Sequence, residues 1–341
     1  MKAKILVGDV RKRLRDIPNG SVQTCITSPP YWGLRDYGHD GQIGLEQTPD
    51  SYVAEIVNVF QEVRRVLADN GTLWLNLGDS YAAQRGGTQM PAETLAGGIS
   101  GHGDEAAHRG RRSNSMNGGR QDITSPEFRT NPVAHRNASA FGLKHKDLVG
   151  IPWRVAFALQ ADGWWLRQDI IWNKPNPMPE SVTDRCTKAH EYLFLLTKSA
   201  NYYFDSAAIA EPSMNLGATE IRFVGNKYGD SEDPKHATKS GNIYTDSGTR
   251  NRRSVWSIAA KPFKGSHFAV MPEALVEPCV FAGSKEGDLV LDPFTGSGTV
   301  GVVALKHGRD FIGVEINPDY AAMAKARILD DGPLFNEAEI C

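Results

Sequence analysis

One stretch near the end of the chain, residues 288–318, restricts the fold more than any other. A short apolar run at residues 289–291 is followed by a segment with helical apolar spacing at 300–305. A second apolar run follows at 311–316. This order predicts a strand, a turn, a helix and a second strand. Because Gly296 and Gly298 have no Cβ, the turn can approach a ligand closely. The stretch therefore predicts an α/β fold with a binding loop at the end of a parallel strand.

The acidic residues of this stretch indicate which ligand the loop would hold. Glu315 ends the second predicted strand, where a carboxylate can accept hydrogen bonds from both hydroxyls of a ribose. Asp292 ends the first strand, where it would oppose a pyrophosphate but could hold an ammonium group. S-adenosylmethionine has a ribose, an ammonium and no phosphate. A nicotinamide dinucleotide is the less favoured alternative, although the glycines at 296, 298 and 301 match its G-x-G-x-x-G pattern.

A second informative stretch follows the predicted buried strand Val22 to Thr27. It reads Ser28-Pro29-Pro30-Tyr31-Trp32, and its two prolines remove backbone donors and hold the chain extended. Backbone and hydroxyl oxygens there stay available as acceptors. Methylation of an exocyclic amine needs such acceptors, because the amine lone pair is otherwise delocalised into the base. Ser28 Oγ and the Pro29 carbonyl are the candidate acceptors, and Tyr31, helped by Trp32, could stack on a base flipped out of a duplex.

The two motifs together resemble those of the amino-methylating DNA methyltransferases. Thr-Ser-Pro-Pro-Tyr is similar to the catalytic motif of that family, which has Asp, Asn or Ser before Pro-Pro-Tyr, and residues 292–299 resemble its cofactor loop. The resemblance implies transfer of a methyl group from S-adenosylmethionine to a base amine, with Ser28, Pro29, Pro30 and Tyr31 as catalytic residues. In the family, Ser at this position is typical of enzymes that methylate cytosine N4 and Asp of those that methylate adenine N6. Cytosine N4 is thus preferred and adenine N6 is the alternative.

The order of the motifs resembles the β group of these enzymes, in which the catalytic loop precedes the cofactor loop. This resemblance implies a circularly permuted, single Rossmann-like α/β domain with a mostly parallel seven-stranded sheet. It also implies that Asp9, after the β-like run Lys4 to Val7, lies beside the cofactor adenine. The cofactor-binding residues are then expected at these positions: Asp9, His267, Asp292, Phe294, Gly296, Gly298, Thr299 and Glu315.

The chain divides into five segments under this interpretation. They are a catalytic half at 1–81, a flexible Arg/Gly-rich insertion at 82–147, later sheet strands at 148–205, a target-recognition region at 206–258 and a cofactor-binding half at 259–335. Within 148–205, we expect Glu191 to Thr197 and Tyr202 to Phe204 to form a β-hairpin. We expect Trp164, Trp165 and Trp172 to pack in the core or on the sheet rather than to stack on a base. The residues expected to contact DNA are Trp32, Arg109, Arg111, Arg112, Arg250, Arg252 and Arg253.

Composition limits the remaining choices. The formal net charge of −2 means that attraction to DNA must come from local clusters of basic residues. Four cysteines without a C-x-x-C pair suggest no metal site, and no apolar run approaches the ~20 residues needed to span a bilayer. We expect a cytoplasmic protein of a prokaryote or phage, a monomer or homodimer whose partner is double-stranded DNA, with a companion restriction endonuclease as a further candidate. The alternative of another class is a catalytically silent DNA-binding module.

Overall fold

The structure, a computed structural model, describes residues 1–34, 36–82, 142–213, 221–222, 243–244, 248–260, 270–332 and 336–341. Most of the predicted insertion 82–147, including Arg109, Arg111 and Arg112, lies outside the described residues, as does His267. The described elements in chain order are β1 (Lys2–Val7), α1 (Val10–Arg13), η1 (Leu14–Asp16), β2 (Val22–Thr27), α2 (Pro49–Val66), β3 (Leu67–Leu77), α4 (Ile151–Ala161), β4 (Trp165–Asn173), β5 (His190–Thr197), β6 (Glu211–Pro212), β7 (Ile221–Arg222), β8 (Ile243–Tyr244), β9 (Thr249–Arg250), β10 (Val255–Ser257), α5 (Glu273–Gly283), β11 (Leu289–Asp292), α6 (Thr299–Lys306), β12 (Asp310–Glu315), α7 (Pro318–Asp331) and β13 (Glu337–Ile340).

The main sheet of the described chain has nine strands in the order β10-β4-β5-β3-β2-β11-β12-β1-β13. Every strand runs parallel to the others except β5, which pairs antiparallel with both β3 and β4. The prediction of a mostly parallel α/β sheet is confirmed, but the number of strands was wrong. The two additional strands, β10 and β13, lie at the two edges and are only three and four residues long. Such short edge strands carry too little apolar pattern to be recognised in a sequence.

The predicted hairpin between 191–197 and 202–204 does not form. The partners of β5 are β3 and β4, with Leu195 opposite Trp74 on one side and opposite Gln168 on the other. The 202–204 segment contains no strand. Tyr203 donates its backbone N–H to the Asn70 carbonyl at 2.9 Å, and the ring of Phe204 stacks on Trp74 with 6.2 Å between centroids. The segment whose aromatic residues suggested a strand therefore contacts β3 without forming a strand itself.

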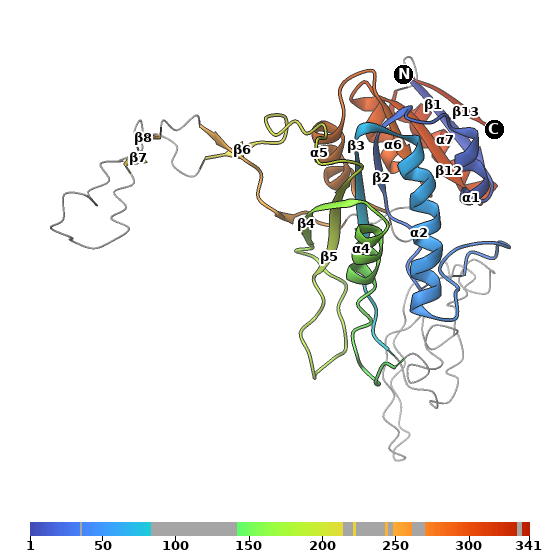
Figure 1. The fold of residues 1–341 in the computed structure, drawn as a ribbon, viewed down its shortest axis with the longest axis vertical. Helices are drawn as coiled ribbons and strands as arrows, with labels where there is room; N and C mark the ends of the chain where they lie inside the picture. Colours follow the sequence, from blue (N-terminus) through green and yellow to red (C-terminus); the bar gives the residue numbers. More distant parts are fainter. Residues whose placement is uncertain are drawn as a thin grey trace, which may run out of the picture.

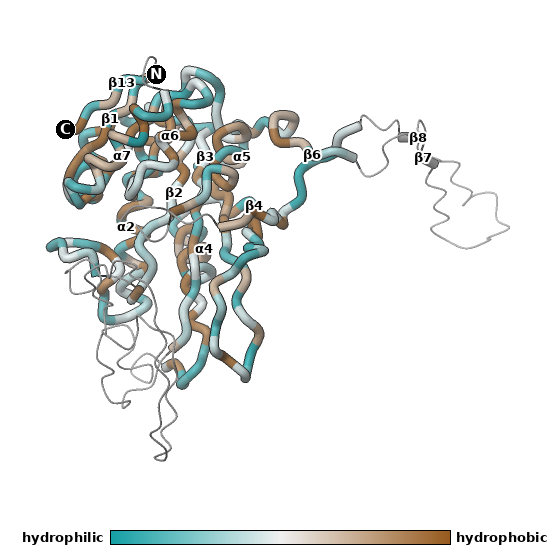
Figure 2. The backbone as a smooth tube through the Cα atoms, turned by 180° about the vertical axis from the view of Figure 1, so that it is seen from behind, coloured by the Kyte–Doolittle hydropathy of each residue, from teal (hydrophilic) through white to brown (hydrophobic). Residues whose placement is uncertain are grey.

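Helices cover both faces of the sheet, so the strands are buried from two sides (Figure 1). The residues of α1, α2 and α4 pack in one hydrophobic cluster, and those of α5, α6 and α7 pack in another. Consecutive strand residues alternate between the clusters, as Cys25 does with Ile26. The apolar segments in Figure 2 follow these central strands and helices. Trp164 and Trp172 are buried, in agreement with the expectation of core or sheet packing, whereas Trp165, the first residue of β4, is 49% exposed.

Helix α2 begins after a capping threonine. Thr48 Oγ1 accepts the backbone N–H of Ser51 at 2.9 Å, and Pro49 occupies the first turn, where its missing N–H costs nothing. The apolar residues that repeat at helical spacing face the sheet, and Tyr52 is fully buried among them. Among the described residues, no helix combines the length and the apolar character that a membrane crossing requires.

The parallel arrangement brings the predicted motifs to one edge of the sheet. Strands β2 and β11 are neighbours, with Leu291 opposite Cys25, so the loops that follow them lie side by side. Strand β12 is the next neighbour of β11, and β1 follows β12. The residues after Thr27, Asp292, Glu315 and Val7 therefore meet where ligand sites of α/β sheets are built.

Candidate active site

A cavity of about 370 Å³ lies at this edge of the sheet. The following predicted residues line it: Ser28, Pro29, Pro30, Tyr31, Asp9, Asp292, Phe294, Gly296, Thr299 and Glu315. The structure thus brings the two loops, which are far apart in the sequence, to one shared space. A cavity of this size is within the range of small-molecule sites. Two predicted residues of the same loops, Gly298 and Trp32, are not part of the lining.

A hydrogen bond joins the two loops directly. The Thr27 hydroxyl donates to Asp292 Oδ1 at 2.6 Å, and the Phe294 backbone N–H donates to the same oxygen at 3.0 Å. Asp292 is only 2% exposed, and this burial raises the pKa of its carboxyl group to about 7. Near neutral pH the group is therefore poised between its neutral and its charged form. A cation bound beside it would favour the charged form.

Glu315 is held at the opposite side of the glycine loop. Its Oε2 accepts the backbone N–H of Gly296 at 2.8 Å, and its Oε1 accepts that of Asn317 at 2.9 Å. Burial raises the pKa of this carboxyl group as well. Gly296 has a φ of 51°, a left-handed conformation that favours glycine. The two backbone bonds fix the carboxylate, and each of its oxygens keeps a lone pair for a ligand hydroxyl.

The structure gives a packing reason for glycine at position 298, which the sequence did not reveal. It precedes α6 with a φ of 79°, and a Cβ on this residue would lie 2.7 Å from the Cβ of Ala324 in α7. Arg327, from the same helix, donates to the Ser297 carbonyl at 2.6 Å. Helix α7 thus supports the glycine loop from behind. Gly298 was expected to contact the cofactor, but the structure places it at this packing contact and not in the cavity.

The catalytic loop is fixed from several elements. The Tyr31 hydroxyl donates to Glu191 Oε2 at 2.7 Å, and it lies 3.5 Å from Ser28 Oγ. A Cβ on Gly78 would lie 2.4 Å from Tyr31 Cε2, so only glycine permits this ring position. Tyr52 of α2 donates its hydroxyl to the Pro30 carbonyl at 2.8 Å. That carbonyl is therefore occupied, and Ser28 Oγ and the Pro29 carbonyl remain the candidate acceptors for an amine.

Trp32 is a core residue, which corrects the expectation that it contacts DNA. Its side chain is 4% exposed, and its Nε1–H donates to the Glu46 carbonyl at 2.9 Å. It packs in the same hydrophobic cluster as α2. A tryptophan next to a catalytic motif can stack on a base or anchor the loop, and the sequence alone does not distinguish these roles. Here the indole anchors the loop.

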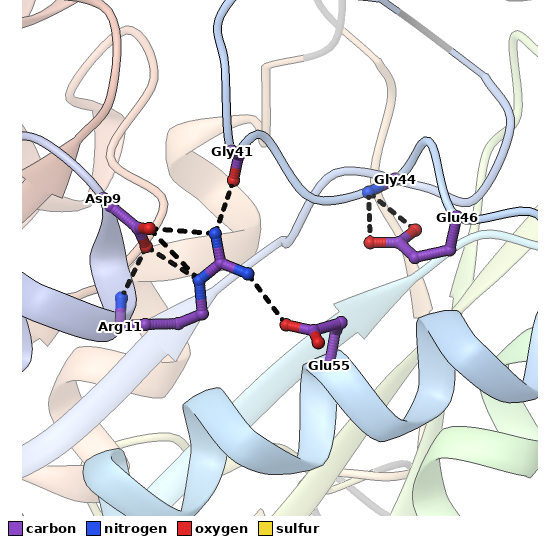
Figure 3. Close-up of polar contacts among 6 residues, drawn as sticks. All are labelled: Asp9, Arg11, Gly41, Gly44, Glu46 and Glu55. Atoms are coloured by element: carbon purple, nitrogen blue, oxygen red, sulfur yellow. Dashed lines mark hydrogen bonds and ion pairs between the residues drawn. The ribbon is translucent and has the colours of Figure 1, made fainter.

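Asp9, which lines the cavity, belongs to a cluster of charged residues (Figure 3). It accepts the backbone N–H of Arg11 at 2.9 Å and pairs with the Arg11 guanidinium, which also donates to the Gly41 carbonyl at 2.8 Å and to Glu55 at 2.9 Å. Burial would raise the pKa of Asp9, but the hydrogen bonds and charge of Arg11 outweigh burial and lower it. Arg11 thereby ties the end of β1, the 36–46 loop and α2 together. The nearby Glu46 carboxylate accepts the Gly44 backbone N–H at 3.0 Å in the same loop.

Further residues that the sequence did not single out as site residues also line the cavity, among them Asn76, Glu191, Trp172 and Lys174. Asn76 is 1% exposed near the end of β3, Glu191 is the second residue of β5, Trp172 lies near the end of β4 and Lys174 follows that strand. The available signal was weak. Asn76 interrupts an otherwise apolar strand, and Glu191 precedes an apolar run, but a single polar residue at a strand end is common.

The described arginines of the predicted recognition region make intramolecular contacts. Arg250 and Arg253 both donate to Glu211 Oε1, at 2.9 and 2.6 Å, where β6 pairs with β9. The guanidinium of Arg252 lies 4.6 Å from the centre of the Trp256 ring. These contacts hold the base of the segment that leaves the sheet beside β4 (Figure 1). A DNA phosphate would compete with Glu211 for two of the three arginines. Within the described residues, no group of three or more His, Cys, Asp or Glu side chains forms a metal site.

The sequence is similar to type II methyltransferases along most of its length. It is 44% identical over 326 residues to M.Cfr9I of Citrobacter freundii, covering 96% of this chain and 87% of the relative. Identity to M.SmaI of Serratia marcescens is also 44%, covering 96% of this chain and 90% of the relative.

Two solved structures share the fold. TTHA0409 of Thermus thermophilus, named as a candidate DNA modification methylase and solved with S-adenosyl-L-methionine, has a TM-score of 0.55 at 22% identity and covers 99% of each chain. The PvuII DNA methyltransferase, described as cytosine-N4-specific, has a TM-score of 0.59 at 17% identity, covering 97% of this chain and 88% of the other. At these identities the likeness shows the fold alone.

The family model of the N6/N4 methyltransferases, described as DNA methylase, matches residues 22–326. This range contains the predicted catalytic loop, the predicted cofactor loop and every residue that lines the cavity except Gly8, Asp9 and Val10. The chain therefore belongs to the N6/N4 family of DNA methylases.

Proposed function

We propose that this protein transfers a methyl group from S-adenosylmethionine to N4 of a cytosine flipped out of double-stranded DNA. One observation carries the proposal. Ser28 and Tyr31 of one loop line the same cavity as Gly296 and Glu315 of the other. An amine held by the first pair would therefore face a cofactor held by the second.

The charges of the cavity favour this cofactor over a dinucleotide. Asp292 and Glu315 both present carboxyl groups to the cavity, where they would repel a pyrophosphate. An ammonium beside Asp292 would compensate the burial of its charge, and a ribose diol could bond the spare lone pairs of Glu315. Phe294 adds an apolar side chain to the lining of the same cavity. TTHA0409, which has a similar fold, was solved with S-adenosyl-L-methionine, and this supports the assignment.

The catalytic loop supplies the geometry for methylating an amine. Ser28 Oγ and the Pro29 carbonyl accept the two amine N–H bonds, which directs the nitrogen lone pair toward the cofactor. Tyr31 stacks on the flipped base and holds it in the plane that this geometry needs. When bound, S-adenosylmethionine supplies an electrophilic methyl group. Because the reaction is a direct displacement, the main contribution of the protein is to position the base and exclude water.

The preference for cytosine rests on Ser28 and on the cytosine-N4-specific PvuII enzyme of similar fold. Adenine N6 is the second candidate, because the same two acceptors fit either amine. Mass spectrometry of nucleosides from unmethylated DNA, treated with protein and cofactor, distinguishes them. We expect N4-methylcytosine, whereas N6-methyladenine would establish the second candidate.

The control for this experiment is Ser28→Ala, which removes an amine acceptor. We expect it to lower turnover with little effect on cofactor affinity, measured by calorimetry. DNA that stays unmethylated with the unaltered protein, although the protein shifts it in a gel, would instead identify a catalytically silent DNA-binding module.

The remaining parts of the proposal concern partners and location. The segments 82–147 and 206–258 are proposed to contact DNA, through phosphates and base edges respectively. The type II names of the relatives support a companion restriction endonuclease and a place in the prokaryotic cytoplasm.

Neutralising Arg109, Arg111 and Arg112 together should reduce the dependence of DNA affinity on salt. An unchanged dependence of affinity on salt concentration would remove the insertion from the interface.

A further inference from the structure

The hydroxyl of Tyr31 is hydrogen-bonded to a partly buried ion pair whose two residues line the cavity. Glu191 Oε2 accepts the Tyr31 hydroxyl at 2.7 Å, and Glu191 Oε1 is paired with the Lys174 ammonium. The side chains of Glu191 and Lys174 are only 16% and 20% exposed. Asn76 Nδ2 donates to the same Oε2 at 3.2 Å. The Glu191 carboxylate is thus held by three groups from different strands or loops.

The ion pair is itself oriented by its surroundings. The Lys174 ammonium lies 4.2 Å from the centre of the Trp172 ring, within the range of a cation–π contact. Trp172 is fixed in turn, since its Nε1–H donates to the Ile258 carbonyl at 2.8 Å. Burying two charges is costly, and an apolar pair of similar size is often at least as stable. Structural stability alone therefore does not account for an ion pair at this position.

The ring of Tyr31 is restrained at two places by these contacts. Near Cε2 the ring lies against the backbone of Gly78, and at the hydroxyl it is bonded to Glu191. Burial, followed by the negative charge of Glu191, raises the pKa of Tyr31 well above its ordinary value, so the hydroxyl keeps its proton and acts as donor. A ring fixed in this way needs no reorientation when a base arrives, which reduces the entropy cost of stacking.

We propose that Glu191, paired with Lys174, is a positioning residue that fixes the Tyr31 ring as the platform for the target base. This inference rests on the proposed function, in which Tyr31 stacks on that base. It adds that the position of the Tyr31 ring is fixed by Glu191 of β5, the antiparallel strand, whose carboxylate does not touch the reacting atoms. Loss of the hydrogen bond between Tyr31 and Glu191 should therefore affect the chemical step more than the binding of either substrate.

A double-mutant cycle of Tyr31→Phe and Glu191→Gln tests whether the hydrogen bond between these two residues contributes to turnover. Tyr31→Phe removes only the hydroxyl, and losing a hydrogen bond to a charged group should lower kcat on the order of ten- to a hundredfold. Glu191→Gln keeps a neutral acceptor of the same size, so we expect a smaller, several-fold loss. In the Tyr31→Phe background, Glu191→Gln should have no further effect on kcat. An equal loss from Glu191→Gln in both backgrounds would overturn the proposal, as would full activity of Tyr31→Phe.

Two further measurements separate positioning from a general structural defect. The KM for S-adenosylmethionine should stay within about twofold in both single variants, while kcat falls. With 2-aminopurine in place of the target base, fluorescence of the DNA complex should rise in Tyr31→Phe, because the flipped base is less firmly stacked. Unaltered fluorescence together with a lowered kcat would contradict a platform role.

The matched control is Glu62→Gln, which alters a partly buried ion pair with Arg65 on α2, away from the cavity lining. Its kcat should equal that of the unaltered protein. The outcome also distinguishes the two levels of inference. If the unaltered protein does not methylate DNA, the proposed function fails; if it does and the cycle is additive, only the positioning role fails.

Discussion

The buried carboxyl group of Asp292 gives the sharpest prediction, a pH dependence of cofactor affinity. In the cofactor-free protein the pKa of this group is about 7, against an ordinary value of 3.8. If the ammonium group of the cofactor binds the ionised form of Asp292, the carboxyl group must lose its proton each time a cofactor molecule binds at acidic pH. Affinity should therefore fall as the pH drops below the pKa. A carboxylate exposed to water would give no such dependence, because with an ordinary pKa near 3.8 it stays ionised throughout this range.

The size of the effect follows from that pKa. For a group with a pKa of about 7, affinity at pH 6.0 should be about eightfold weaker than at pH 7.5, or about 1.2 kcal/mol. The upper pH is chosen because an α-amino group, with an ordinary pKa of about 7.7 to 8.0, is still mostly charged there. Calorimetry in two buffers of different ionisation enthalpy should also show release of about 0.9 proton at pH 6.0 and about 0.2 at pH 7.5.

Asp292→Asn is the control, because Glu315 is also buried and could contribute a similar slope. The variant should bind the cofactor weakly and lose most of the difference between pH 6.0 and 7.5. It should also stabilise the cofactor-free protein. A carboxyl group whose folded pKa is raised costs stability as pH rises from about 4 to about 7, here at most about 4 kcal/mol. Equal affinity at both pH values, or the full slope in Asp292→Asn, would refute the reasoning.

Three substitutions test other contacts of the site. Gly78→Ala places a Cβ 2.4 Å from Tyr31 Cε2, so turnover should fall while calorimetry shows unchanged cofactor affinity; normal turnover would mean that the ring moves freely. Trp32→Ala should destabilise the protein by about 3 to 5 kcal/mol in denaturant unfolding. A loss of DNA affinity without loss of stability would restore the role that we have excluded. Gly298→Ala should lower the melting temperature and weaken cofactor binding together, because its Cβ would displace Ala324; an effect on binding alone would place Gly298 at the ligand.

The β-α-β unit at 288–318 could be predicted because all of its signals are local. Apolar runs of strand length, two glycines and helical spacing follow one another within one stretch, and the observed β11, α6 and β12 match them. The cavity could be anticipated for the same reason, since Asp292 and Ser28 each follow a strand. What joined the two motifs was the expectation of parallel neighbouring strands, which the pairing of β11 with β2 confirms.

The contacts of Tyr31 could not be predicted, because they depend on the order of strands in space. Glu191 reaches the tyrosine only because β5 is reversed and begins at the edge where β2 and β3 end. Nothing near Glu191 in the sequence encodes that reversal. The prediction of a strand at 202–204 was wrong for a related reason. Aromatic residues that pack on a sheet and those that extend it as a strand have the same local pattern.

The hydrogen bond from Thr27 to Asp292 has a consequence for how the two ligands would bind together. Thr27 directly precedes Ser28 in the chain, so loss of a proton from Asp292 alters a contact of the loop that holds Ser28 and Tyr31. Occupancy of either half should then change the affinity of the other by the same factor, since coupling between two ligands is reciprocal. The methyl donor and the duplex would then not bind independently, and the 2.6 Å contact between Thr27 and Asp292 would carry the coupling between them.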